Sequence, residues 1–597
     1  MRDAPNLLQP GFWLPLALAG WLLGVATPLL VGQVLAFLRV FSVTTALMLS
    51  ALVLPGLAWL YARDGAPYTL PRSTSSQTLA PAWIGVAVLL WALMVVPVLL
   101  WPRSALGGFM GGAIAWDVVY YHLPKAADLV QRGHMWNLAL PYGQYPLGWE
   151  TLLALSVGLS HRADGLGPAS AVALVGFMLA FAALLHRETD WPVWGTILAV
   201  GGMMFSFYLP VPNNPWREFG RVVHYTSGIG KNDVLAAALL LTTLVHLPLS
   251  RSRAHARLGA HPTGVGLALA AALAVKPHAG LLALALVGVG WVSRRPRPKG
   301  KVLWAWLAAA GVGSLWLVRN LLLLGRPFSP IADILARRAL MYALPQKVFW
   351  VSLPKTWLLV SAALVGLTFW AARHPSWRGP VAAAWVLYGG LLGTPASARL
   401  EGAHGPVAWR FGLALLAWIW VLLWAWVAPY GRRLVLPARV RRGWRVGQTV
   451  LALALTVGLL VRYGHRLRLE PEHGWLLNDP FPTPVGRGGY HSVFDFIHRQ
   501  VRDAVIDFDG APPWYVYGPG LTNRPVRPGH YPAGMPAAVP QPKPDHWLFC
   551  AATWQPHGRV ADPDAVTQQV AQWQAAGRTV LYADTACALA RAEPSSP

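Results

Sequence analysis

The chain is dominated by apolar stretches, each about as long as a helix that crosses a lipid bilayer. Such a helix needs roughly 20 mainly apolar residues. Stretches of this length recur along the chain, and only 12% of its 597 residues are charged. Soluble domains carry roughly 25% charged residues, so most side chains of this protein never contact water. The pattern predicts an α-helical polytopic membrane protein.

The apolar lengths predict about 13 spanning helices. Single spans are expected at residues 12–38, 40–62, 79–101, 165–185, 191–209, 233–249, 302–324, 352–372, 380–394, 409–427 and 446–462. Residues 264–292 are too many for one span, and Lys276 and Pro277 interrupt them. The residue before a proline disfavours helix, so we expect a hairpin of two short helices there.

Basic residues between the spans predict the orientation. They concentrate in residues 250–261, 294–301, 373–378 and 432–445. Positively charged loops stay in the cytoplasm. The chain is therefore expected in the cell (inner or plasma) membrane, with a cytoplasmic N-terminus and an extracytoplasmic C-terminus. The same loops account for the net charge of +25, and we expect no nucleic-acid partner.

Whether all the basic loops fall on one side of the membrane depends on residues 146–160. The segment is apolar but short, and it contains Gly148 and Glu150. A span here would put the basic loops on both sides of the membrane, whereas a helix lying in the interface leaves them on one side. We adopt the interfacial helix.

The C-terminal stretch has a different composition. Short strand-like runs at 514–517, 547–549 and 579–582 alternate with helical patterns at 493–505 and 564–576. This alternation predicts a small α/β domain. Both cysteines, Cys550 and Cys587, lie in it; outside the cytoplasm they could form a disulfide, or they could remain two free thiols.

Asp117 is the sharpest candidate for chemistry. It follows a predicted span and lies among aromatic residues, where partial burial raises a carboxyl pKa and suits a general base or a metal ligand. An aspartate solvated at the interface or capping a helix is the alternative. His122 follows five positions later, which does not favour a shared helix face. A metal pair of Asp117 and His122 is left open, and no metal site is assigned.

Further candidates lie at the same outer face. Asp233 is at the mouth of a span, where acids are often functional, although it could simply cap the helix. Lys276, Arg319 and Arg410 are the candidate cations for binding a phosphate. The alternative for each is a basic side chain near a helix end that extends to the membrane–water interface without binding a ligand. Further candidates to line the site are Tyr121, His122, Glu150 and Lys231. The chain lacks a Walker loop, an HExxH, paired CxxC motifs and a GxSxG motif in a suitable context, so those enzyme classes are poorly supported.

Several short motifs together resemble one family. They are Trp116-Asp117 through Tyr121-His122-Leu123-Pro124, Tyr145-Pro146-Leu147-Gly148, Lys231-Asn232-Asp233, Ala274-Val275-Lys276-Pro277, Trp316-Leu317-Val318-Arg319-Asn320 with Gly325-Arg326-Pro327-Phe328-Ser329-Pro330, and Trp409-Arg410-Phe411. Their order over residues 80–427 resembles the GT-C fold glycosyltransferases that use polyprenyl-phosphate sugars, such as protein O-mannosyltransferases and lipid A aminoarabinose transferases.

The resemblance implies a three-part organisation. Residues 1–78 hold two additional N-terminal helices, residues 79–462 a GT-C-like core with a large first outer loop at 102–164, and residues 463–597 the extracytoplasmic domain. It also implies transfer of a sugar from a polyprenyl-phosphate donor to a glycan, lipid or protein acceptor, with inversion. Asp117 would be the base, Asp233 would orient a substrate, and the three cations would hold the leaving phosphate. The family's first loop carries paired acids where this chain has one aspartate, so dependence on a divalent metal stays open.

Two other classes remain as alternatives. A transporter or flippase of lipid-linked saccharides also needs many spans and phosphate-binding cations, but transporters usually bind at the bilayer midplane and often contain repeats. No repeat is evident in this sequence. The second alternative is a non-catalytic membrane scaffold, which predicts that Asp117 can be changed without consequence.

The orientation is testable by cysteine accessibility. In an Arg297→Cys variant of a chain without native cysteines, the new thiol should stay unlabelled by a membrane-impermeant reagent in intact cells and react after permeabilisation. Labelling in intact cells would reverse the predicted orientation, because residues 294–301 form one of the loops that define the cytoplasmic side.

Overall fold

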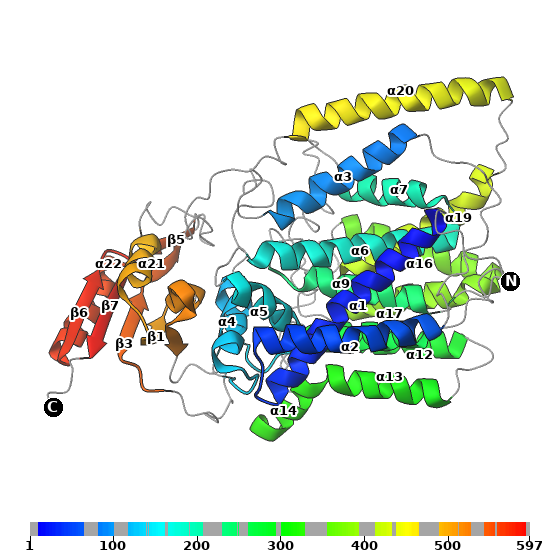
Figure 1. Cartoon of the computed structure of the whole chain (residues 1–597). Coiled ribbons are helices and arrows are strands. Elements are labelled where there is room, and N and C mark those ends of the chain that lie inside the picture. The colour runs from blue at the N-terminus through cyan, green and yellow to red at the C-terminus, as the bar shows by residue number, and fades with distance from the viewer. Residues whose placement is uncertain are drawn as a thin grey trace.

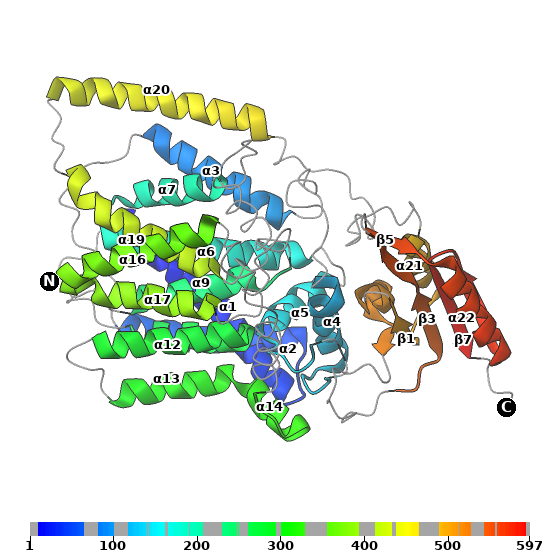
Figure 2. The same cartoon turned by 180° about the vertical axis from the view of Figure 1, so that it is seen from behind.

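The structure is a computed structural model with a helical bundle and a small sheet domain against one end of it (Figure 1). It describes residues 10–64, 81–100, 118–138, 140, 142–160, 165–189, 191–206, 230–247, 249, 261–293, 300–328, 355–392, 412–432, 438–464, 489–510, 513–526, 542–555 and 558–592. In both views the first helix, α1 (Pro10–Phe37), begins at the end of the bundle opposite to the sheet domain (Figure 2).

Five helices within the described ranges are long and apolar enough to cross a membrane. They are α1 (Pro10–Phe37), α2 (Val43–Arg63), α3 (Pro81–Leu99), α6 (Leu166–Thr189) and α20 (Ala438–Tyr463). A bent pair, α13 (Gly300–Gly313) and α14 (Leu315–Leu324), adds a sixth candidate. Since spans are identified here by length and composition, the predicted number of about 13 is not confirmed.

Shorter helices fill the bundle. They are α7 (Val193–Ser206), α9 (Asp233–His246), α11 (Pro262–Val275), α12 (Pro277–Ser293), α16 (Lys355–Arg373), α17 (Arg378–Leu392) and α19 (Leu413–Arg432), with a 3₁₀ turn η5 (Pro375–Trp377) before α17. Of these, α9 and α11 are buried along nearly their whole length and pack on each other, while α6 covers α9. Together α6, α9 and α11 form the centre of the core.

The predicted hairpin at Lys276 is confirmed. Lys276 has an extended backbone between α11 and α12, which pack side by side. The span expected at residues 302–324 is present as a bent pair of helices, because α13 and α14 meet at an angle of 51°. Gly313 and Ser314 stand at the bend, and a Cβ on Gly313 would lie 2.2 Å from the Ala270 carbonyl oxygen of α11. Such a Gly-Ser pair readily kinks a helix.

Two short helices lie at the end of the bundle beside the sheet domain. A π-helical turn, η2 (Val118–His122), leads into α4 (Leu123–Arg132), and α5 (Gly148–Ser160) packs against α4. With 13 residues, α5 is about 20 Å long, which is too short to span a bilayer core of about 30 Å. It contacts α1, α6 and α11, and most of its side chains are buried.

The predicted orientation is not tested by these helices. The basic segments 250–260, 294–299 and 433–437 lie outside the described residues, as do residues 102–117 of the first outer loop. The orientation and the domain boundaries at 78 and 462 therefore stay predictions.

The C-terminal part is the predicted α/β domain. Its five-stranded sheet has the order β2-β1-β3-β7-β6, with β1 parallel to β2 and β3, and β7 antiparallel to β3 and β6. The strands are β1 (Val505–Asp509), β2 (Arg524–Val526), β3 (His546–Cys550), β6 (Arg578–Ala583) and β7 (Cys587–Ala592), and β4 (Ala552–Gln555) pairs separately with β5 (Gly558–Ala561). Helices α21 (Gly489–Gln500) and α22 (Pro563–Ala575) pack on this sheet. Alternate side chains of β7 point to opposite faces of the sheet, one set packing with α21 and the other with α22, so the two helices cover opposite faces.

Strands at 547–549 and 579–582 and a helix at 564–576 are confirmed within β3, β6 and α22. The helical pattern at 493–505 ends sooner than predicted, since β1 begins at Val505. The strand prediction for 514–517 is wrong: these residues form the 3₁₀ helix η11 (Pro513–Tyr517), which starts at a proline whose fixed φ suits a first helical turn. A second 3₁₀ turn, η12 (Pro519–Leu521), follows.

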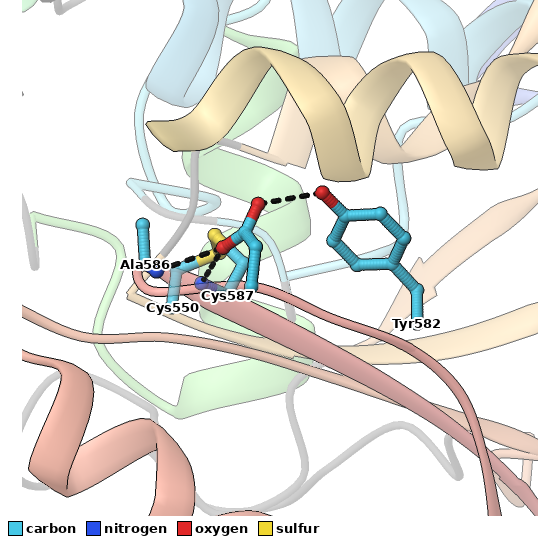
Figure 3. Close-up of a disulfide and its surroundings, with 5 residues drawn as sticks. Cys550, Tyr582, Ala586 and Cys587 are labelled. Carbon is cyan, nitrogen blue, oxygen red and sulfur yellow. Dashed lines mark hydrogen bonds between the residues drawn. A yellow bond between two sulfur atoms is a disulfide. The ribbon is translucent and has the colours of Figure 1, made fainter. Parts of the chain in front are cut away.

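Of the two alternatives for the cysteines, the structure contains the disulfide. Cys550 on β3 and Cys587 on β7 are direct partners in the antiparallel register, and both are buried (Figure 3). The turn before β7 is held by Asp584, whose Oδ1 accepts from the amides of Ala586 and Cys587, both at 2.7 Å. The hydroxyl of Tyr582 donates to Oδ2 of Asp584.

Removing the disulfide should weaken the C-terminal domain. The bond closes a loop of 37 residues, and a loop of this length corresponds to about 3–4 kcal/mol of unfolding free energy. We expect a Cys550→Ser/Cys587→Ser variant of the full chain to lose its tail to a protease at lower temperature than wild type. Equal protease resistance would show that the bond contributes little.

Candidate functional site

The ends of three helices meet where the bundle faces the sheet domain. A Cβ on Gly148, the first residue of α5, would lie 2.6 Å from the carbonyl oxygen of Ala274, so glycine permits α5 to start against the end of α11. The neighbouring Trp149 indole donates to the Gly230 carbonyl at 2.7 Å, just before α9. The start of α5, the start of α9 and the end of α11 are thereby held together.

The turn η2 reaches the same junction. Gly230 has a φ of 83°, in the left-handed region, and a Cβ there would lie 2.6 Å from Cγ1 of Val118. Val118 therefore packs against the start of α9. It is the first described residue after the predicted base, Asp117, which itself lies outside the described residues.

Asp233 and Lys276 form an ion pair at this junction. Lys276 Nζ donates to Oδ1 of Asp233, and both side chains are largely buried. The N-cap of α9 is Asn232, so Asp233 is not the cap residue that was considered as an alternative. A carboxylate in the first turn of a helix is favoured by the helix dipole, and burial strengthens its attraction to the ammonium group. The structure thus brings together two residues that the sequence analysis selected separately.

A second charged cluster connects α4 and α5. Oε1 of Glu150 lies 2.8 Å from Nδ1 of His122 and 3.6 Å from Nζ of Lys125, and all three side chains are at most 4% exposed. Burial alone would raise the pKa of the Glu150 carboxyl, but Lys125 and the hydrogen bond from His122 together hold that pKa below its ordinary value of 4.5. Burial also lowers the pKa of Lys125, with Arg319 adding to this effect and Glu150 opposing it.

Three tyrosines stand beside this cluster. The ring of Tyr142 lies 4.9 Å from that of Tyr121 and 5.5 Å from that of Tyr145, and Nζ of Lys125 lies 5.5 Å from the Tyr121 ring. All three tyrosines are half-buried. Tyr142 has a φ of 56°, a conformation that costs a residue with a side chain roughly 1–3 kcal/mol and persists where the surroundings enforce it.

Arg319 has a different set of contacts from those predicted for a phosphate ligand. It is completely buried, and its guanidinium donates to the carbonyl oxygens of Met135 and Tyr145 and to Oδ1 of Asn320. The Asn320 amide in turn donates to the Gln144 carbonyl oxygen. These bonds hold the α4–α5 loop against α14, so Arg319 shapes the site through the loop backbone.

The C-terminal domain is attached to the other side of α4. The buried Tyr517 hydroxyl donates to the Pro124 carbonyl oxygen at 2.8 Å. Gln131 donates to the carbonyl oxygens of Leu521 and Asn523. Because Lys125 lies on the same short helix, α4 connects the domain with the charged cluster.

Not every predicted site residue can be placed. Lys231 is buried beside Asp233 at the start of α9, whereas Arg410, like Asp117, lies outside the described residues. In the described part of the chain, His, Cys, Asp and Glu form no group of three that could hold a metal, and the pair of Asp117 and His122 stays open.

Sequence reasoning missed Lys125 and Tyr142, and it named Tyr145 in a motif but not as a site residue. Lys125 could have been found, because it follows Tyr121 by four positions and His122 by three, the spacings that share one helix face. The two tyrosines belong to an irregular loop, where no periodicity indicates which side chains meet.

No protein-family model matches the sequence, and no curated protein matches it. Solved structures similar to the chain include the crystal structure of ArnT from Cupriavidus metallidurans bound to undecaprenyl phosphate. The identity is 14%, the match covers 86% of this chain and 98% of that chain, and the TM-score is 0.41. A TM-score of this size does not establish a shared function, so we argue the function from this chain's own residues.

The ionisation of Glu150 predicts a pH dependence. Since its pKa is depressed in the folded protein, its carboxylate contributes stability that is present above the unfolded value near 4.5 and lost as pH falls through the folded value. We therefore expect the difference in unfolding free energy between wild type and Glu150→Gln to be constant near neutrality and to shrink below pH 4.5. Thermal unfolding in detergent over a pH series measures it, and a difference independent of pH would contradict an ionised Glu150.

Proposed function

We propose that the chain is a membrane glycosyltransferase of the GT-C type, which moves a sugar from a polyprenyl-phosphate donor to an acceptor hydroxyl. The observation that carries this proposal is the buried Asp233–Lys276 pair beside the His122–Lys125–Glu150 cluster. Asp233, Lys276 and His122 fall in the motifs that resemble that family, and Lys125 and Glu150 closely follow two of those motifs. A lysine close to a bilayer-spanning bundle suits a lipid phosphate, and the neighbouring polar groups suit a sugar.

The proposed reaction is a single displacement. Asp117 accepts the proton of the acceptor hydroxyl as its oxygen attacks the anomeric carbon; the bond from that carbon to the phosphate oxygen breaks, and polyprenyl phosphate leaves with inversion. Lys276 stabilises the charge on the leaving phosphate, with Arg410 as the second cation proposed from the sequence. Asp233 holds the ammonium group of Lys276 in position.

The cellular location follows from the same proposal. Disulfides persist in oxidising compartments, so the Cys550–Cys587 bond favours a C-terminal domain outside the cytoplasm. That domain and the charged clusters lie at the same end of the bundle (Figures 1 and 2). We therefore place the reaction at the outer face of the inner or plasma membrane, with the N-terminus in the cytoplasm.

This location also bears on the alternative of a transporter or flippase. Transporters usually bind their substrate near the bilayer midplane, at broken helices. In this chain the charged clusters lie toward one end of the bundle, where η2 and α4, which carry His122 and Lys125, contact the C-terminal domain. The position favours chemistry at the membrane surface over movement of a lipid across it.

An Asp117→Asn variant tests the proposed base. Loss of a general base lowers a rate by about 10²–10⁴, so we expect at least a hundredfold slower transfer from polyprenyl-phosphate sugars, with the donor still bound. Transfer of radiolabelled sugar by purified protein in nanodiscs measures the rate. Asp495→Asn is the control, because Asp495 pairs only with the exposed Arg499 among the contacts described for it.

The outcomes separate the three classes. Transfer by Asp117→Asn at the wild-type rate would remove Asp117 from the mechanism. Movement of the lipid-linked sugar across vesicles without any transfer would indicate a flippase. A wild-type protein that neither transfers nor moves these lipids would favour the scaffold.

A further inference from the structure

We propose that Glu150 binds an uncharged hydroxyl group of the donor sugar and thereby selects a neutral sugar over one carrying an amino group at that position. The inference rests on the proposed function and names the chemical class of its sugar. It starts from an atom that the protein leaves without a partner.

One oxygen of Glu150 is satisfied and the other is not. Oε1 is held by His122 and Lys125, whereas Oε2 is buried and has no hydrogen-bond partner within the described part of the chain. A buried acceptor without a donor costs free energy, most of all when it is charged. Native proteins satisfy nearly all such atoms, so a donor supplied by a ligand explains Oε2.

The surroundings of Glu150 suit a sugar. Tyr121, Tyr142 and Tyr145 are half-buried and lie edge to face beside the cluster, so they offer apolar ring surface together with hydroxyl groups. A pyranose has the matching combination of C–H faces and hydroxyl edges. The strained backbone of Tyr142 keeps its ring between the other two, and strain of this kind gathers at functional sites.

The charge balance decides between a hydroxyl and an ammonium group. The Glu150 carboxylate already has Lys125 within ion-pairing distance, and Arg319 is close enough to lower the pKa of Lys125. An ammonium group at Oε2 would add another positive charge to a buried site that has two cations for one carboxylate. Like charges in such surroundings repel strongly, whereas a hydroxyl donates without adding charge.

The position agrees with a sugar attached to the phosphate near Lys276. Glu150 is two residues after Gly148, which contacts Ala274, and Ala274 is two residues before Lys276. A lipid phosphate at Lys276 and a sugar hydroxyl at Glu150 would therefore belong to one donor molecule that lies across the junction of α5 and α11.

Donor binding tests this selection. The probes are polyprenyl phosphate alone, a panel of polyprenyl-phosphate hexoses, and their counterparts with one hydroxyl replaced by an amine, each bound to the full chain in nanodiscs. We expect at least one neutral polyprenyl-phosphate hexose to bind tenfold or more tightly than the bare lipid phosphate. When the hydroxyl that Glu150 binds is replaced by an amine, this gain in affinity should be lost. Tighter binding of the amino sugars would overturn the inference.

Variants assign the effect to Glu150. Glu150→Gln should bind the bare lipid phosphate within about twofold of wild type and lose the tenfold gain from the hexose. The matched control is Glu188→Gln, a similarly buried glutamate paired with Arg187 on α6, which should keep the gain. If Glu150→Gln unfolds because Lys125 is left unpaired, the Lys125→Met/Glu150→Gln variant removes both charges and should show the same loss.

Failure of the inference differs from failure of the proposed function. A wild-type protein that binds neither the bare lipid phosphate nor any sugar-linked lipid contradicts the function itself. Binding of the lipid with Glu150→Gln equal to wild type for every probe shows that water satisfies Oε2 and overturns the inference alone. An equal weakening for the bare and sugar-linked lipids overturns it as well, because Glu150 would then act on the phosphate or on the fold.

Discussion

A carboxylate that water cannot reach has to be neutralised by the protein, and Glu150 imposes this requirement on the end of the bundle. Its burial is costly unless cations and hydrogen-bond donors surround it. Lys125 and His122 meet that need only if α4 lies against α5. The α5 helix is in turn fixed by Gly148 against α11, and the loop between α4 and α5 by Arg319. Helices that are distant in the chain thus become neighbours around one charge.

Much of the bundle could be predicted from the sequence, because apolar length and prolines act locally. The hairpin around Lys276 and the strands β3 and β6 follow from such local signals. The bend at Ser314 could not be predicted in this way. Gly313 and Ser314 permit a bend there, but what fixes it is the close approach of Gly313 to the backbone of α11. A long-range contact of this kind leaves no periodic trace in the sequence.

For the candidate site, the sequence likewise predicts some features and not others. Charge and position within an apolar chain were enough to select Asp233, Lys276, His122 and Glu150. Their pairing joins residues 28 and 43 positions apart, which only the packing of helices reveals. The contacts of Arg319 were hidden for another reason, because its partners include backbone carbonyl groups that every residue carries. The roles of Asp117 and Arg410 remain predictions from the sequence.

The bond from Tyr517 to the Pro124 carbonyl oxygen has a consequence for biogenesis. A ribosome makes the chain from its N-terminus, so all helices of the bundle are synthesised before the residues that brace α4 exist. Until η11 and η12 have folded and docked, α4 lacks the support of Tyr517, Leu521 and Asn523. The end of the molecule that carries the proposed site is therefore the last part to mature, and a nascent or truncated chain would lack the contacts that brace α4.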